Sequence, residues 1–243
     1  MRGTGRPVVA VLAPMASELR PVARAGRLRA ASAVAGRHAY DGRIGGADVF
    51  AVRIGIGTEA ATNATAQILD DRPADHVVVV GIAGGVGAAH GLGDLIAPAL
   101  VVDAASGLGF RPHPLGATDR QPAGSLFTGD ELIRDRARLA QLDAEGVIGL
   151  DMESASVAAV CEARGIPWSV ERAISDLAED NVIEDAVGSL ARADGRPDGP
   201  AVARYLLRGP WRARHLARLG RQMQVAARVA AVSAVAGIGR LAP

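Results

Sequence analysis

The chain has 243 residues, of which 49% are hydrophobic and 22% charged, and its formal net charge is +1. All 27 of its Lys and Arg residues are arginine, which excludes mechanisms that need a Schiff-base, P-loop or kinase strand lysine. The two Trp, two Tyr and three Phe residues are too few for a base-stacking surface, so no nucleic-acid partner is expected, and the single cysteine, Cys161, excludes an internal disulfide or a cysteine-based metal cluster.

Short apolar runs alternate with helical patterns along most of the chain. Runs without polar alternation are typical of strands that are buried on both faces. In chain order the sequence predicts strand 7–13, helix 17–25, strand 47–54, helix 59–69, strand 75–80, strand 93–102, helix 130–142, strand 146–150, helix 152–163 and strand 168–173. Residues 103–124 are rich in glycine, proline and serine and are predicted to form a long functional loop. This alternation predicts a largely parallel α/β sheet that is covered on both faces.

The small net charge hides an uneven distribution. No acidic residue follows Asp198, whereas 8 of the 27 arginines do, so residues 199–243 carry +8 and residues 1–198, with 19 arginines and all 26 acidic residues, carry −7. We therefore expect one domain over residues 1–198 and a basic helical extension over residues 199–243, with a break at Gly209-Pro210. The extension either packs on the acidic body, which the complementary charges favour, or lies on an anionic membrane as a basic amphipathic helix.

Several features of the sequence predict a cytoplasmic protein, and the histidine spacing predicts that it binds no metal. A lone cysteine fits a reducing compartment, and the short apolar run that begins at Val8 ends at Pro14, so it is interpreted as a strand and not as an export signal. No stretch approaches the ~20 apolar residues of a membrane span. The five histidines show no ligand spacing, so no metal site is predicted.

Two glycine-rich turns follow predicted strands. Residues 55–60 (GIGTEA) fit the dinucleotide fingerprint G-x-G-x-x-A, with Asp70 and Asp71 where an acid could bind ribose. A lone match is weak, so a tight turn that can face an anion is favoured over a dinucleotide-binding oxidoreductase. Residues 81–87 (GIAGGVG) either let a ligand approach the backbone or let the loop pass a neighbouring strand, and both interpretations stay open.

Three acidic side chains come directly after three of the predicted strands. They are Glu18, Glu153 and Asp176. Singly, each is explained as a first-turn acid or a helix cap. Jointly, they are expected to converge, because the carboxyl ends of parallel strands lie on one rim of the sheet and ligands bind there.

The order of these motifs resembles the nucleoside phosphorylase superfamily, above all its 5′-methylthioadenosine/S-adenosylhomocysteine nucleosidases. The motifs are M-A-S-E at 15–18, G-I-G-T at 55–58, G-I-A-G-G at 81–85, G-D at 93–94, T-G-D at 128–130, D-M-E at 151–153 and R-A-I-S-D at 172–176. The resemblance implies a three-layer α/β/α fold around a central mixed sheet, with residues 1–198 as the catalytic domain. It also implies hydrolytic release of adenine from a nucleoside without a cofactor, a role in methionine salvage, and a homodimer.

The resemblance also implies roles for individual residues. Asp176 would protonate the purine N7, Glu18 would activate the attacking water, and Glu153 would hold the ribose hydroxyls with Met152 beneath the sugar. This division between an acid and a base agrees with the general chemistry of glycoside cleavage. The remaining expected positions are Ser175 and Arg172, which would orient the acid and the base, and Ala83, Gly84, Leu132, Ile133, Met15 and Ile56, which would line the base and sugar pocket.

Hydrolysis and phosphorolysis remain alternatives for such a site. Glu18 favours water as the nucleophile, because a carboxylate at that position would repel phosphate. A possible phosphate or anion site at Arg53, Gly55, Gly57 and Thr58 keeps a phosphate-dependent purine nucleoside phosphorylase open. A catalytically silent nucleoside-binding module is a further alternative.

Departures from the family pattern concern the substrate. Leu132 stands where relatives often stack an aromatic ring on adenine, and the loop 103–112 lacks the usual tyrosine, with Phe110 as either a pocket wall or a packing residue. The 5′ group of the nucleoside is therefore left open and could be bulkier than methylthio. The basic extension is loosely similar to the ends of hopanoid-associated phosphorylase-like proteins, which act on adenosyl-hopane-type lipids.

Overall fold

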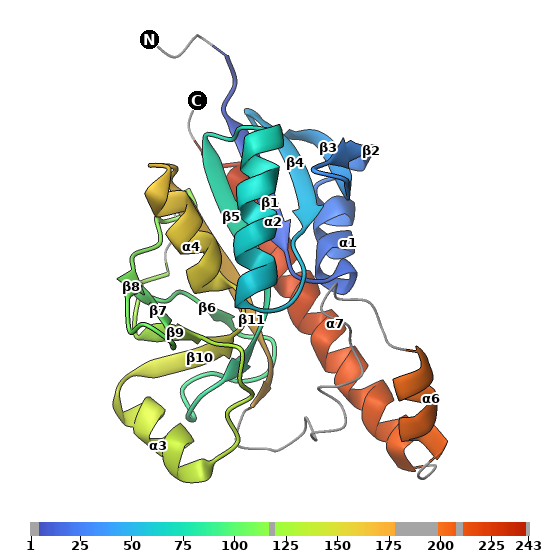
Figure 1. Ribbon diagram of the computed structural model, residues 1–243, viewed down its shortest axis with the longest axis vertical. Helices are drawn as coiled ribbons and strands as arrows, with labels where there is room; N and C mark the ends of the chain where they lie inside the picture. Colours follow the sequence, from blue (N-terminus) through green and yellow to red (C-terminus); the bar gives the residue numbers. More distant parts are fainter. Residues whose placement is uncertain (1–4, 117–119, 178–198, 208–210, 242–243) are drawn as a thin grey trace.

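Figure 1 shows a computed structural model, which describes residues 5–116, 120–177, 199–207 and 211–241. The strands are β1 (Val8–Ala13), β2 (Arg29–Val34), β3 (Arg37–Ile44), β4 (Ala47–Arg53), β5 (His76–Gly85), β6 (Leu95–Ile96), β7 (Leu100–Asp103), β8 (Gly109–Phe110), β9 (Ser125–Thr128), β10 (Val147–Asp151) and β11 (Trp168–Leu177). The helices are α1 (Ala16–Ala25), α2 (Thr58–Asp71), α3 (Arg136–Ala144), α4 (Ser154–Ala163), α6 (Gly199–Leu207) and α7 (Trp211–Ile238).

All the strands belong to one mixed sheet, as expected. Its order is β2-β3-β4-β1-β5-β10-β9-β7-β8, and β11 pairs with β5 and β6. Parallel pairs join β4, β1, β5 and β11 in the centre, whereas β10 runs antiparallel to β5. The carboxyl ends of β1, β5 and β11 therefore share one rim of the sheet.

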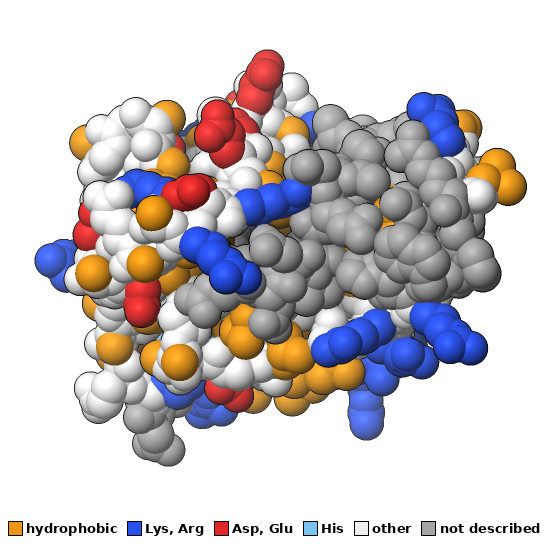
Figure 2. Space-filling model, turned by 90° about the horizontal axis from the view of Figure 1, so that it is seen from below, with side chains coloured by type: hydrophobic (Ala, Val, Ile, Leu, Met, Phe, Trp, Pro, Cys, Tyr) orange, Lys and Arg blue, Asp and Glu red, His pale blue; other side chains and the backbone are white. Residues whose placement is uncertain are grey.

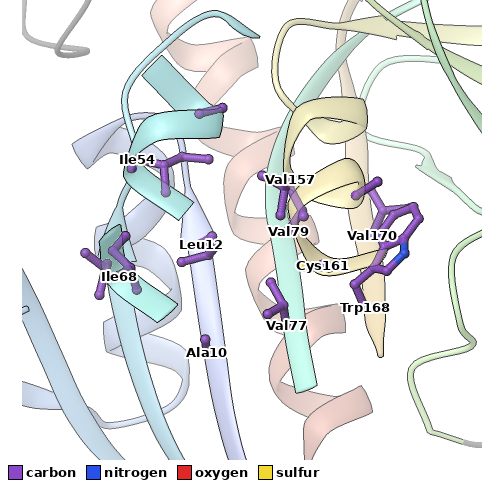
Figure 3. Packing of buried hydrophobic residues seen from close by; sticks show 14 of the residues in the cluster. Ala10, Leu12, Ile54, Ile68, Val77, Val79, Val157, Cys161, Trp168 and Val170 are labelled. Carbon is purple, nitrogen blue, oxygen red and sulfur yellow. The ribbon is translucent and has the colours of Figure 1, made fainter. Parts of the chain in front are cut away.

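Helices cover both faces of the sheet, which gives three layers. In Figure 1, α2 and α4 lie in front of the sheet, while α1 and α7 lie behind it. The alternating side chains of β1 serve both layers, because Ala10 and Leu12 join the core beneath α2 and α4, and Val9 and Val11 join the core beneath α1 and α7. Figure 3 shows the first of these cores, where Trp168 packs beside Cys161.

The second half of α7 belongs to the core behind the sheet. Its buried positions there are mostly alanines, and these small side chains allow the helix to contact α1, β5 and β11 closely. Gly237 is packed closely as well, because an added Cβ there would lie 2.7 Å from the Leu115 side chain. None of the described helices combines the length and the apolar character that crossing a bilayer requires.

Several predicted boundaries were wrong. The hairpin β2–β3 was not predicted, because its mostly exposed side chains carry no apolar pattern, and neither was β9. Residues 81–85 extend β5, the predicted strand 93–102 is divided into β6 and β7 around Pro98, and the helix predicted from residue 130 begins only at Arg136. The predicted break at Gly209-Pro210 lies outside the described residues.

Candidate active site

The segments that follow β1 and β10, and the middle of β11, bring Glu18, Glu153 and Arg172 together. Glu18 lies in the first turn of α1, Glu153 precedes α4, and Arg172 projects from β11. Arg172 Nη1 lies 3.7 Å from Glu18 Oε1, and Arg172 Nη2 lies 3.2 Å from Glu153 Oε2. All three side chains are buried. Glu18 and Glu153 therefore meet at Arg172 as expected, although β10, which precedes Glu153, runs antiparallel to β5 and not parallel as predicted.

Asp151 joins this group, although sequence reasoning gave it no role. It lies at the end of β10, and its Oδ2 is 2.8 Å from Arg172 Nη2, the shortest of the three carboxylate contacts of that arginine. Thr128 Oγ1 donates to Asp151 Oδ1 at 2.6 Å, and Ser154 Oγ donates to Asp151 Oδ2. The only signal in the sequence was its place as the first residue of the D-M-E motif, beside the half-buried Met152.

The glycines of β5 make room for this cluster. A Cβ on Gly81 would lie 2.3 Å from both Arg172 Nη1 and Glu18 Oε1, which no side chain could accept. A residue larger than glycine would therefore push the arginine and the glutamate away from the strand. The glycine-rich segment thus lets side chains of the site lie directly over the backbone of β5.

Burial changes the acidity of both glutamates. Burial raises the pKa of Glu18 to about 7, although Arg172 and the backbone N–H groups of Ile82 and Met15, each 2.9 Å away, act in the opposite direction. Burial also raises the pKa of Glu153 above its ordinary value, with Arg172 again opposing it. Both carboxyl groups can therefore exchange protons near neutral pH, as acid–base catalysis requires.

Asp176 lies further along β11, beside the backbone of β5. A β-bulge between Ile174 and Asp176 shifts the register there, so that Asp176 lies opposite Gly84. Ser175 Oγ is 2.5 Å from Asp176 Oδ1 and 3.4 Å from the Ala83 carbonyl oxygen, so its single O–H can donate to either. The predicted residues Ser175, Asp176, Ala83 and Gly84 are thus neighbours.

The turn before α2 already holds two carboxylates. The Gly57 N–H donates to Glu153 Oε1 at 3.2 Å, and the Thr58 N–H donates to Asp130 Oδ1 at 2.7 Å. Thr58 Oγ1 donates to the other oxygen of Asp130 at 2.5 Å. These contacts use the helix N-terminus where a phosphate or a dinucleotide pyrophosphate would bind. Protein carboxylates therefore take the place of the predicted anion at this turn.

The other predicted positions lie around the turn and beside it. Gly55 and Ile56 belong to the turn, and Gly55 has a φ of 93°, which favours glycine. Arg53 ends β4 and has no ion-pair partner among the described residues. The described residues also contain no group of histidine, cysteine and acidic side chains that could hold a metal ion.

A groove of about 1090 Å³ lies next to this cluster. Leu132 and Ile133 line it, as do Leu108 and Phe110 of the long loop and the first turns of α2. Phe110 therefore forms part of a wall, which was one of its two expected roles. The absence of an aromatic ring at Leu132, whose side chain is 46% exposed, leaves this side of the groove open.

Fold and site together define an α/β enzyme whose site is built from buried carboxyl groups and one arginine. The sequence matches the family described as the Phosphorylase superfamily over residues 8–131 and 116–196, and the chain belongs to this family. It is 28% identical over 195 residues to a 5′-methylthioadenosine/S-adenosylhomocysteine nucleosidase of Haemophilus influenzae (strain 86-028NP), covering 69% of this chain and 85% of the relative.

Solved structures share the fold. The nucleosidase of the same name from Neisseria meningitidis, in complex with methylthio-immucillin-A, is 22% identical and has a TM-score of 0.69, covering 96% of this chain and 99% of that one. The futalosine hydrolase of Helicobacter pylori strain 26695 is 17% identical and has a TM-score of 0.68, covering 95% and 97% of the two chains. The predicted three-layer α/β/α fold with a central mixed sheet is confirmed.

Proposed function

We propose that this protein hydrolyses the N-glycosidic bond of adenine nucleosides and releases adenine. The observation that carries the proposal is the cluster of three carboxyl groups around Arg172. One of them, Glu18, is a buried base whose pKa is raised to about 7. The similarity to a methylthioadenosine and adenosylhomocysteine nucleosidase over 85% of the length of that relative supports the same reaction.

Each acidic group has a part in this reaction. Asp176 donates a proton to the purine N7, so that adenine leaves as a neutral base, and Ser175 orients it. Glu153 binds the ribose hydroxyls as positive charge develops on the sugar, with Met152 beneath the ring. Glu18 removes a proton from the attacking water. The described contacts of Ser175 with Asp176 and of Arg172 with both glutamates support this assignment.

Further residues complete the pocket. Backbone groups of Ala83 and Gly84 contact the base and the sugar, and Ile133 meets the adenine edge through its backbone. Met15, Ile56 and Leu132 close the remaining sides. The place of Ala83 and Gly84 beside Asp176, and of Leu132 and Ile133 in the groove, supports this arrangement.

Water is preferred over phosphate as the nucleophile. A phosphorylase needs cationic groups or backbone N–H donors that are free to bind phosphate. Here Asp130 and Glu153 accept the N–H groups of Thr58 and Gly57, and a second anion at this turn would be repelled by both carboxylates. Arg53, which has no ion-pair partner among the described residues, is the one observation that favours phosphorolysis as a second candidate.

The size of the groove bears on the 5′ group of the substrate. A groove of about 1090 Å³ slightly exceeds the upper end of the range of roughly 300–1,000 Å³ that small-molecule sites occupy. A substituent larger than methylthio therefore has room between Phe110 and α2. The shared fold with a futalosine hydrolase fits a bulkier nucleoside.

The decisive experiment measures free adenine from methylthioadenosine, adenosylhomocysteine and futalosine, with and without phosphate. We expect release without phosphate and no ribose 1-phosphate. Asp176→Asn should lose turnover by at least about 100-fold, because a general acid contributes that much. Asp48→Asn, which removes a half-buried acid that pairs with Arg43 away from the site, is the matched control. Strictly phosphate-dependent turnover would establish the phosphorylase instead.

We also propose that two copies of the chain form a homodimer across the groove. Leu108 and Leu132 line the groove and are 61% and 46% exposed, which favours cover by a second copy. Light scattering should show twice the chain mass, and Leu108→Glu should lower it to one chain. A wild-type monomer at assay concentration would refute the dimer.

We further propose that the enzyme works in the cytoplasm and serves methionine salvage. The buried free thiol of Cys161 fits a reducing compartment.

Finally, we propose that the C-terminal region contacts an anionic membrane. Along α7, exposed arginines and the two exposed valines Val225 and Val232 follow one another at steps of three or four residues and form one stripe, in which the valines are 54% and 60% exposed. Figure 2 shows arginine side chains gathered at the end of the molecule that holds α6 and the start of α7. The arginines of the stripe are Arg214, Arg218, Arg221 and Arg228, which have no ion-pair partner among the described residues.

Arginines with interspersed valines suit a lipid surface, because arginines bind headgroups while apolar side chains enter the interface. We expect sedimentation with vesicles that contain phosphatidylglycerol and none with pure phosphatidylcholine. Replacing the four stripe arginines by glutamine should abolish binding. The control replaces four other exposed arginines: Arg20, Arg24, Arg29 and Arg136. Binding that survives the stripe substitutions, or that ignores lipid charge, would overturn this contact.

A further inference from the structure

Asp151 makes the shortest carboxylate contact with Arg172 in the buried charge cluster, and it also lines the edge of the groove. Three carboxylates and one guanidinium meet there, from α1, from the end of β10 with the start of α4, and from β11. The charged groups that face one another are Glu18, Asp151, Glu153 and Arg172. If all three acids were ionised, the buried cluster would carry two uncompensated negative charges, which burial strongly disfavours.

The geometry shows which acid Arg172 holds most closely. Asp151 is closest to Arg172, at 2.8 Å, and it also accepts hydrogen bonds from the hydroxyl groups of Thr128 and Ser154. Glu18 and Glu153 lie further from the guanidinium, at 3.7 and 3.2 Å. Hydrogen bonds from hydroxyl donors stabilise the ionised form of a carboxyl group. Burial raises the pKa of Glu18 and of Glu153, so these two glutamates can retain protons.

We propose that Asp151 is a positioning residue for the hydrolysis. Its carboxylate holds the Arg172 guanidinium in place and partly neutralises the positive charge, so that the two glutamates can still exchange protons. Asp151 itself touches neither nucleoside nor water in this scheme. Without it, Arg172 would turn fully to Glu18 and Glu153 and fix them as permanent ions. This inference rests on the proposed function, because it concerns the base of that reaction.

The charge of Asp151 also acts through space. It raises the pKa of Glu18 and of Glu153, in addition to the larger effect of burial. Its removal should therefore make both glutamates stronger acids and weaker bases. A residue that only stabilised the fold would change the amount of active enzyme and would leave the pH dependence as it was.

The test is the pH profile of kcat/KM for adenine release by Asp151→Asn. We expect the acid limb, where Glu18 must lose its proton, to move to lower pH by about one unit, since a nearby charge shifts a pKa by about that much or more. Asp151→Glu keeps the charge and should keep the limb near its original position. Asp41→Asn removes an aspartate that pairs with Arg72 away from the site and should change nothing. An unmoved limb in Asp151→Asn would overturn the proposal.

A second readout separates this inference from the proposed reaction. NMR titration of protein labelled at the glutamate carboxyl carbons follows Glu18 and Glu153 without any turnover, and Glu18→Gln and Glu153→Gln assign the two signals. Lower midpoints in Asp151→Asn support the positioning role even if no tested nucleoside is cleaved, which would refute only the proposed function. Unchanged midpoints in an active enzyme would refute the positioning role alone.

Discussion

Arg172 is the residue on which the site depends most. It is 1% exposed and faces three carboxylates, so its own charge is retained despite burial. Burial opposes that charge, while Asp151, Glu153 and Glu18 together raise the pKa of the guanidinium. Each of these four charged groups can stay buried only because the opposite charges beside it offset the cost of removing it from water.

Arg172→Met should destabilise the fold most above the Glu18 pKa of about 7. The variant leaves buried acids without a cation, and we expect a loss of about 3–5 kcal/mol in unfolding free energy there. The loss should shrink near pH 5, because the acids can then take up protons and become neutral. Urea unfolding at both pH values measures this difference, and an equal loss at both would contradict it.

Leu132→Phe should improve the binding of adenine nucleosides. Leu132 is 46% exposed in the groove, and an aromatic ring there could stack on the base. Such stacking is worth about 1 kcal/mol, which corresponds to a KM lower by about fivefold with little change in kcat. Leu132→Met, which adds no ring, serves as the control. An unchanged KM would show that the base does not contact this side chain.

Among the elements, β5 runs from the opposite rim of the sheet, where it begins at His76, to the candidate site, where its glycines lie. At its start, His76 Nε2 lies 2.8 Å from Ser169 Oγ of β11, and Ser169 Oγ donates to the His113 carbonyl oxygen at 2.7 Å. Burial, with a smaller effect of His113, lowers the pKa of His76 to about 4. The histidine is therefore neutral in the folded protein at pH values where an unfolded chain would protonate it.

His76→Gln should reduce the acid sensitivity of the fold. Because the folded pKa is depressed, the contribution of His76 to stability is present above pH 6.5 and is lost as pH falls toward 4. At pH 5 the wild type should have lost about 2 kcal/mol through this group, whereas the variant should not. Glu18 and Glu153 act with the opposite sign, so only the difference between the two proteins, measured by urea unfolding across this range, is informative.

The elements also show how far sequence reasoning reaches. Buried apolar strands such as β1 and β11 and the acids that follow strand ends were predicted, because burial and connectivity leave a direct pattern. The hairpin β2–β3 was not predicted, because its side chains are mostly exposed and obey no period. Asp151 was seen only as the first residue of the D-M-E motif and was given no role, because an acid beside a helix start is common, and only the folded chain shows that it meets Arg172.

At the scale of the whole molecule, both ends of the chain contribute to one core. Alanines of α7 pack in the same cluster as Val9 and Val11 of β1, whereas the four arginines of the stripe on the same helix are exposed. The charge division of the sequence between residues 1–198 and 199–243 therefore does not coincide with a division of the packing. The helix uses one face for the fold and leaves the other to the solvent.

Deleting residues 199–243 should therefore prevent stable folding. The deletion would expose the apolar surface of α1, β5 and β11 that α7 covers. Ending the chain after Leu207, which removes α7 alone, should have the same effect. Circular dichroism and thermal unfolding would show the loss, and a cooperative transition near that of the full chain would contradict this expectation.

The cluster around Arg172 also restricts how this protein can evolve. A single change that removes the arginine leaves three buried acids without their cation, and a change that removes Asp151 alters the pKa values of the two glutamates that remain. Descendants that lose the reaction are therefore expected to change Arg172 and its acids together, and a lineage with the arginine intact is expected to have retained Asp151. Substitution patterns at these four positions should consequently be correlated across relatives, even where the substrate differs.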